Sequence, residues 1–134
     1  KMEAGGSLNP ASAETVAQKM HSIYQEGRDV YKYAVKGMAG ITAEIVEKNG
    51  YTGADVALFV PHQANIRIID AISKRLGVAD RMYTNVDKYA NTSSAALAIA
   101  LDEAVRAGQI KEHDIVLMAA FGAGLTWGAS VVRW

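Results

Sequence analysis

The spacing of hydrophobic positions along this chain predicts alternating helices and strands. Between Asp29 and Lys48 apolar residues recur at steps of three and four, the period of an amphipathic helix, and Asn49-Gly50 ends the run. The same period predicts a second helix at about residues 63–76. Its inward-facing side chains are expected to be Ile66, Ile69, Ile72 and Leu76.

Short apolar runs between the helical segments predict the strands. Residues 56–60 are continuously apolar, as is typical of a strand covered on both faces. A short strand is expected at residues 82–86. Residues 115–121 and 125–134 predict two further strands, joined by a glycine-bearing turn of hairpin length.

The chain also contains an alanine-rich run and a loop-like beginning. Residues 93–107 are rich in alanine, the best helix former, and small side chains permit close helix packing. We therefore expect this helix, through Ala96 and Ala100, to provide a surface that pairs with another half-domain. Residues 1–26 concentrate small and polar residues, which predicts a connecting segment with a short helix capped by Ser12.

This order of elements predicts an α/β fold. Strands that alternate with helices imply parallel pairing with helices on the faces of the sheet, and the last hairpin adds an antiparallel edge. We expect residues 27–134 to form one layered domain. Its sheet should be mixed but mostly parallel, with helices on both faces and a C-terminal antiparallel hairpin.

Composition narrows the classes of partner and chemistry. Half of the 134 residues are hydrophobic and the mean hydropathy is +0.02, so part of the surface is expected to meet other protein. Basic and acidic residues both number 14, without long runs of one sign, which argues against nucleic acid or an anionic membrane as a partner. No run approaches the ~20 apolar residues of a membrane span, and a cytoplasmic location is expected.

The absence of cysteine limits what the chain can do unaided. With no cysteine there is no disulfide, no thiolate metal ligand and no thiolate nucleophile. The first residues, Lys1 and Met2, fit a fragment, a processed product or an engineered piece, and the sequence leaves these open.

Three loops fall at predicted strand ends, where open α/β sheets place their ligands. They read PHQAN at 61–65, YANTSS at 89–94 and FGAGLTWG at 121–128. Each has a structural explanation when taken singly. A histidine after a buried strand is more often structural than catalytic, an asparagine before a helix is usually a cap, and Gly-x-Gly is usually a turn.

Taken together, in this order and spacing, the loops resemble the C-terminal half of the 3-oxoacyl-(acyl-carrier-protein) synthase III family of thiolase-like condensing enzymes. There PHQAN carries the catalytic histidine, a G-N-T-S-A phrase carries the catalytic asparagine, and FGGGFTWG closes the active site. The resemblance runs from about Gly27 to Trp134. It implies a thiolase-like half-domain.

The resemblance also implies a reaction and its catalytic groups. Such enzymes begin fatty-acid synthesis by decarboxylative condensation of an acyl-CoA with malonyl-acyl-carrier-protein. His62 and Asn91 would stabilise the enolate, and the backbone N–H of Ala123, where the family commonly has glycine, would serve the oxyanion hole. The nucleophilic cysteine belongs to the N-terminal half of the family, so this chain alone is predicted to be inactive. Coenzyme A is then a substrate, and no cofactor or metal is expected.

Binding residues follow by the same resemblance. The positions that match the coenzyme A tunnel are Gly27, Tyr31, Ala64 and Asn65. The positions that match the basic face for the acidic carrier protein are Lys32, Arg67, Lys74 and Arg75. A solvated charged face explains these four cations equally well. The whole enzyme implied by the resemblance is a homodimer.

Other interpretations fit less well or stay open. A metal site formed by His21, His62 and His113 is disfavoured because their spacing is irregular and no acidic cluster accompanies them. Elongating synthases use two histidines, and plant polyketide synthases carry Gly-Phe-Gly-Pro-Gly where this chain has Phe-Gly-Ala-Gly. A non-catalytic half-thiolase module that pairs with itself or with another half remains the alternative from a different functional class. The starter acyl group is left undetermined.

Overall fold

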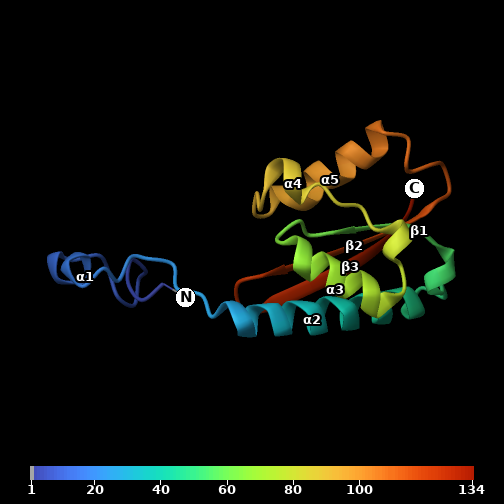
Figure 1. Ribbon diagram of the computed structural model, residues 1–134. Coiled ribbons are helices and arrows are strands. Elements are labelled where there is room, and N and C mark those ends of the chain that lie inside the picture. Colours follow the sequence, from blue (N-terminus) through green and yellow to red (C-terminus); the bar gives the residue numbers. More distant parts are fainter. Residues whose placement is uncertain (1) are drawn as a thin grey trace. The chain divides into compact units, whose positions relative to one another are not determined.

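The computed structural model describes residues 2–134 (Figure 1). The chain divides into two compact units, residues 1–30 and 31–134. In the first unit, α1 (Ala13–Ala17) is capped as predicted, because the Ser12 hydroxyl accepts a hydrogen bond from Thr15 N–H. The helix has only five residues. Gln18 is its C-cap. The next residue, Lys19, has a φ of 56°, and this left-handed conformation cannot continue a helix.

The second unit is built on a three-stranded sheet. Its strands are β1 (Val56–Pro61), β2 (Ile115–Gly122) and β3 (Thr126–Arg133), in the order β1-β2-β3. β1 and β2 are parallel, whereas β2 and β3 form the predicted antiparallel hairpin. The expected α/β class, with a mixed sheet and a C-terminal hairpin, is confirmed.

Helices cover both faces of this sheet (Figure 1). On one face, α2 (Gly27–Lys48) and α3 (Ile66–Leu76) bury Met38 and Ile72 against Phe59 of β1. On the opposite face, α5 (Ala95–Arg106) packs against Leu58 and Val60. Adjacent β1 residues therefore belong to different cores, as the two-residue period of a strand requires. β1 is buried along almost its whole length, in agreement with its unbroken apolar sequence.

The alanine-rich helix was correctly predicted, but its small face has a different role from the one expected. Ala96, Ala100 and Ala104 are buried within this chain, and the last two pack beside Val60 and Val116 of the sheet. Small side chains allow α5 to approach its own sheet closely. The prediction that a pairing surface runs through Ala96 and Ala100 is therefore wrong.

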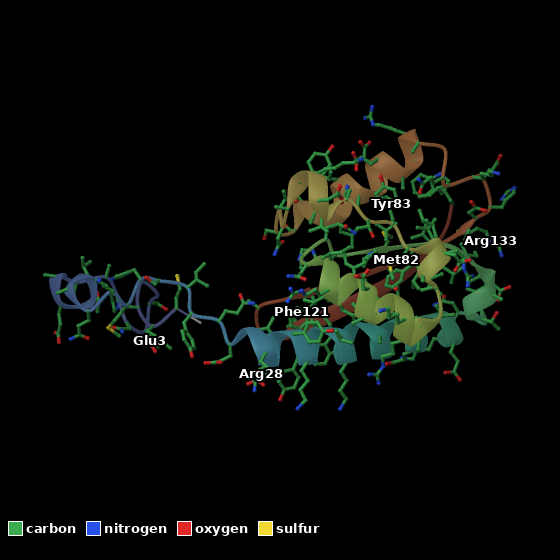
Figure 2. The ribbon with its side chains drawn as sticks, viewed as in Figure 1. Glu3, Arg28, Met82, Tyr83, Phe121 and Arg133 are labelled. Atoms are coloured by element: carbon green, nitrogen blue, oxygen red, sulfur yellow. The ribbon has the colours of Figure 1, made fainter. Side chains whose placement is uncertain are left out.

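The predicted strand at 82–86 is replaced by a single bridge and a short helix. Met82 bridges Phe59 in parallel orientation, and Tyr83 N–H donates to the Phe59 carbonyl at 2.8 Å. Met82 packs against the core on the α2 side of the sheet, whereas Tyr83 is buried on the α5 side (Figure 2). Two residues later the chain leaves the sheet and forms α4 (Val86–Tyr89), because the Gln63 side chain accepts a hydrogen bond from the backbone N–H of Asn85.

The ends of α3 follow local capping rules. Asn65 caps its N-terminus and Gly77, with a φ of 68°, ends it in the left-handed conformation. Ile69 and Ile72 are buried as predicted, but Ile66 is 46% exposed because it lies in the first turn, next to the loop. Short 3₁₀ turns at Gly53–Asp55 and Ala79–Arg81 complete the connections. No helix within residues 2–134 is long and apolar enough to cross a membrane.

Candidate functional site

The three loops singled out in the sequence all follow the same end of the sheet. His62 comes directly after β1, and the turn at residues 123–125 comes directly after β2, which runs parallel to β1. The Met82 bridge is also parallel to β1, and its segment leads through α4 to Asn91. Parallel elements direct their carboxyl ends to one edge of a sheet, where α/β proteins commonly bind ligands.

His62 is fixed by backbone bonds at the end of β1. Its N–H donates to the Ala119 carbonyl of β2 at 2.7 Å, and its own carbonyl accepts from Ala64 N–H at 3.0 Å. The side chain is half-buried, and this burial lowers the pKa of the imidazole below its ordinary value. At neutral pH the ring is therefore neutral and carries one N–H donor.

Asn91 lies in a tight turn between α4 and α5. Its side-chain oxygen accepts from Ser93 N–H at 3.1 Å, which leaves the amide nitrogen as the donor end of the side chain. The backbone on both sides is left-handed, with φ of 55° at Ala90 and 58° at Ser93. Asn91 is exposed, so its amide is accessible to a ligand.

Gln63 joins the His62 loop to the segment that precedes Asn91, and this role was not anticipated from the sequence. The side chain is 1% exposed. Its Nε2 donates to the carbonyls of Pro61 (2.9 Å) and Tyr83 (3.2 Å), while its Oε1 accepts from Asn85 N–H at 2.9 Å. One buried amide thus connects the residue before His62 to the segment that leads to Asn91.

Glu103 of α5 contacts the same segment, residues 83–89, through its carboxylate. Its carboxylate accepts from Asn85 Nδ2 at 2.6 Å, from Tyr89 OH at 2.9 Å and from Tyr83 OH at 3.3 Å, and Lys88 Nζ lies 3.5 Å away. The hydrogen bond from Asn85, followed by that from Tyr89, lowers the pKa of the Glu103 carboxyl. Sequence periodicity gives no sign of this cluster, because its members lie 14 to 20 residues from Glu103.

Ala123 lies in the exposed turn between β2 and β3. Its carbonyl accepts from Thr126 Oγ1 at 3.1 Å. Beyond the turn, Trp127 packs over Gly37 of α2, so closely that a β-carbon on residue 37 would lie 2.7 Å from the indole. The glycine-rich turn is therefore anchored to α2 through the first residues of β3.

The four residues assigned to coenzyme A binding lie in different surroundings. Gly27 is the first residue of α2 and lies in the N-terminal unit, whereas Tyr31 is 42% exposed on the same helix. Ala64 is half-buried beside His62. The Asn65 side chain caps α3 by accepting from Arg67 N–H at 2.9 Å, which gives it a structural function of its own.

The four basic residues assigned to carrier-protein docking are all exposed. Lys32 lies on α2, and Arg67, Lys74 and Arg75 lie on α3. Arg67 and Lys74 are seven residues apart and share one face of the helix. Within residues 2–134 none of these four cations forms an ion pair with a carboxylate.

The described part of the chain has no metal-binding cluster, and it has an apolar cavity away from the three loops. No group of three or more His, Asp or Glu side chains in residues 2–134 is arranged to hold a metal ion. An apolar cavity of about 290 Å³ lies between α2, α3 and the sheet, lined by residues that include Thr42, Val56 and Leu76. Val56 begins β1 and His62 follows its end, so this cavity and the three loops lie toward opposite ends of the strand.

Comparisons with known proteins agree with this arrangement. Residues 46–134 match the family described as 3-oxoacyl-[acyl-carrier-protein (ACP)] synthase III C terminal. A beta-ketoacyl-[acyl-carrier-protein] synthase III of Caldanaerobacter subterraneus is 55% identical over 99% of this chain. The match covers 40% of that relative, so the chain spans well under half of the length of such proteins.

Solved structures show the same fold. The beta-ketoacyl-[acyl carrier protein] synthase III of Thermus thermophilus is 55% identical, with a TM-score of 0.81 over 83% of this chain and 35% of that one. A second 3-oxoacyl-(acyl-carrier-protein) synthase III structure has a TM-score of 0.92 over all of this chain and 43% of its own, at 22% identity. That likeness concerns the fold alone.

Proposed function

The chain belongs to the 3-oxoacyl-[acyl-carrier-protein] synthase III family, whose C-terminal domain it matches, and from this we propose that it supplies the C-terminal half of a condensing acyltransferase. The reaction is the decarboxylative condensation of an acyl-CoA with malonyl-acyl-carrier-protein, which begins fatty-acid synthesis. One observation carries the proposal. The loops of His62 and Asn91 follow the same edge of the sheet, and Gln63 ties the His62 loop to Tyr83 and Asn85 in the segment that leads to Asn91.

The condensation requires hydrogen-bond donors to an enolate oxygen rather than a strong base. Loss of carbon dioxide from the malonyl group leaves its bonding electron pair as an enolate, and the thioester oxygen becomes negative. The enolate carbon then attacks the acyl-cysteine carbonyl, the new C–C bond forms, and the C–S bond breaks to release the thiolate. Stabilisation of the enolate oxygen is the task that falls to this chain.

His62 and Asn91 suit that task. The His62 ring is neutral because burial lowers its pKa, so its remaining N–H is a hydrogen-bond donor without a formal charge. The Asn91 amide is held by its bond to Ser93, with Nδ2 as the donor. Two donors fixed before the reaction stabilise developing charge without reorganisation, and loss of one typically costs about 10²–10³ in rate.

The other assignments extend the same proposal. The Ala123 N–H would contribute to the oxyanion hole for the acyl-cysteine carbonyl. Tyr31 and Ala64, with Gly27 and Asn65, would line the pantetheine tunnel. The exposed cations at 32, 67, 74 and 75 would receive the acidic carrier protein, since none is neutralised by an ion pair within residues 2–134. The nucleophilic cysteine would come from an N-terminal half, in an enzyme that acts as a dimer.

The alternative from another class is a half-thiolase module without catalytic function. In that case the polar residues at the sheet edge would serve only as caps and turn residues, as Asn65 does. Half-burial after β1 lowers the pKa of His62 in either case, so the two proposals are separated by the activity of the assembled enzyme.

Reconstitution tests the proposal. The 134-residue chain alone should form no covalent acyl adduct with acetyl-CoA, as measured by intact mass. Assembled with a cysteine-bearing N-terminal half from a relative, it should support formation of 3-oxoacyl-carrier-protein, whereas the same half with its cysteine changed to alanine should not. A stable assembly that acylates its cysteine but never condenses would favour the structural module.

A further inference from the structure

Glu103 lies at the centre of the polar contacts that hold the Asn91 loop, although it is remote from both proposed donors in the sequence. Three hydrogen bonds and one ion pair converge on its two carboxylate oxygens. Three of these four partners, Tyr83, Asn85 and Tyr89, donate through neutral groups, and the fourth, Lys88, is a cation. A carboxylate accepts at both oxygens and can satisfy all of them at once.

The geometry of these contacts distributes them along one short segment. Tyr83 and Asn85 bond to Oε2, whereas Tyr89 and Lys88 meet Oε1, so a single side chain spans the seven residues from the sheet to the end of α4. The residue after α4, Ala90, has the unusual backbone angles φ 55° and ψ −158°. Such a conformation is costly for any residue except glycine, so it persists only where neighbouring contacts hold it.

A second, buried link continues from this segment to His62. Asn85 donates its side-chain N–H to Glu103 and its backbone N–H to Gln63, and Gln63 in turn donates to the Pro61 carbonyl beside His62. Asn85 and Gln63 are each 1% exposed. Buried hydrogen bonds of this kind are strongly specified, because an unpaired partner keeps its full desolvation cost.

We propose that Glu103 is a positioning residue for the proposed reaction: its carboxylate fixes residues 83–89, and through Asn85 and Gln63 it sets the Asn91 donor relative to His62. The inference rests on the proposed function for its catalytic consequence. Glu103 acts through Asn91 and does not itself touch the substrate. Removing its charge while keeping its shape should therefore loosen one donor and leave the fold in place.

Glu103→Gln is the variant that separates these roles. One carboxylate oxygen becomes an NH₂ group, which cannot accept a hydrogen bond. It would face either Tyr83 and Asn85 or Tyr89 and the Lys88 ammonium. Glu44→Gln is the matched control. It makes the same chemical change at an exposed position of α2, where Lys48 is its one ion-pair partner among residues 2–134, at 2.6 Å.

The first measurement is amide hydrogen exchange in the 134-residue chain. In Glu103→Gln, exchange should become about tenfold faster at Asn85 and Ser93, whose N–H groups bond to Gln63 and Asn91, while Leu117 in the sheet core keeps its rate. Uniform acceleration across all three would mean that Glu103 only stabilises the fold. Unchanged exchange at Asn85 and Ser93 would overturn the proposal outright.

The second measurement is the rate of malonyl decarboxylation in the reconstituted enzyme. Glu103→Gln should slow it about 10- to 100-fold, as expected of a misplaced catalytic group, while acyl transfer to cysteine keeps its rate. In an Asn91→Ala background the same change should add no further loss, because its effect passes through Asn91. Additive losses would refute positioning.

The two measurements distinguish failure of the proposed function from failure of the role assigned to Glu103. If the unaltered assembly never decarboxylates malonyl-carrier-protein, the proposed function is wrong, yet exchange still decides whether Glu103 fixes the loop. If Glu103→Gln does not fold, Tyr89→Phe removes one exposed donor to the same carboxylate and should accelerate exchange at Ser93 about threefold, with Tyr33→Phe on α2 as control. No change at Ser93 in that variant would count against the proposal.

Discussion

The indole of Trp127 on β3 lies against Gly37 of α2, with no room for a side chain between them. A β-carbon at residue 37 would lie 2.7 Å from Cδ2 and 2.9 Å from Cε3 of the ring. Trp127 directly follows the first residue of β3, so this contact fixes the strand at the point where it leaves the glycine-rich turn. Glycine at position 37 therefore serves packing rather than helix formation.

The effect of alanine at position 37 on stability tests this contact. Alanine in place of an interior helical glycine ordinarily stabilises by about 0.5–1 kcal/mol. We expect that gain for Gly40→Ala, because apart from its own helix no described residue lies within 4 Å of the new methyl group. We do not expect it for Gly37→Ala, which must displace the indole. Urea unfolding should show Gly37→Ala less stable than Gly40→Ala by about 1 kcal/mol or more. Equal stabilities would show that the contact is loose.

The backbone at Ala90 predicts a stabilising change. With φ 55° and ψ −158°, Ala90 occupies a region that only glycine adopts readily. Ala90→Gly should raise the free energy of unfolding by about 1 kcal/mol. Ala107→Gly is the control and should lower it, because Ala107 has ordinary helical angles. Destabilisation by both changes would mean that Ala90 is not under strain.

The same position connects the sequence pattern to the structure. The phrase that carries the asparagine in the family has glycine where this chain has Ala90, and the left-handed backbone explains that preference. We therefore expect Ala90→Gly to preserve the bond between Asn91 and Ser93, which nuclear magnetic resonance of the Ser93 amide would report.

The pKa of His62 predicts a dependence of stability on pH. Burial lowers the folded-state pKa, so the unfolded chain binds the proton more readily. The stability contributed by neutral His62 is present above the unfolded pKa of about 6.5 and is lost as the pH falls toward the folded value. His62→Gln should remove this part of the pH dependence, whereas His113→Gln, at an exposed position, should leave it. An imidazole resonance of His62 that titrates at or above the ordinary value would contradict the assignment.

The inner face of α5 gives a further test. Ala100 is fully buried against the sheet, whereas Ala98 is exposed on the same helix. Ala100→Glu would bury an unpaired charge and should cost about 3 kcal/mol or more in unfolding free energy, while Ala98→Glu should have little effect. Tolerance of Ala100→Glu, with changed association instead, would restore the pairing surface that the sequence suggested.

Local signals in the sequence were sufficient where the determining contacts are local. Asn65 and Gly77 bound α3 by capping rules that act within a few residues, and the unbroken apolar run of β1 marks a strand buried on both faces. Ser12 likewise identifies the start of α1, but nothing in the apolar period indicates the left-handed backbone at Lys19, just beyond the C-cap of this five-residue helix.

The features that the sequence pattern could not predict depend on contacts between residues far apart in the sequence. The predicted strand at 82–86 ends after one bridge because Gln63, 22 residues earlier, takes the N–H of Asn85. Glu103, 18 residues later, holds the Asn85 side chain. Hydrophobic periodicity records which side chains are buried, not which polar atoms pair, so the pattern could not predict the link from Gln63 to the segment before Asn91.

The rate of malonyl decarboxylation in His62→Ala and Asn91→Ala tests the central assignment most directly. Both variants are measured in the assembly with a cysteine-bearing half, alongside acyl transfer to that cysteine as an internal control. If His62 and Asn91 stabilise the enolate, each change should slow decarboxylation about 100-fold or more and leave acyl transfer near its original rate. Decarboxylation at the unaltered rate in both variants would contradict the assignment and leave these residues as caps and turns.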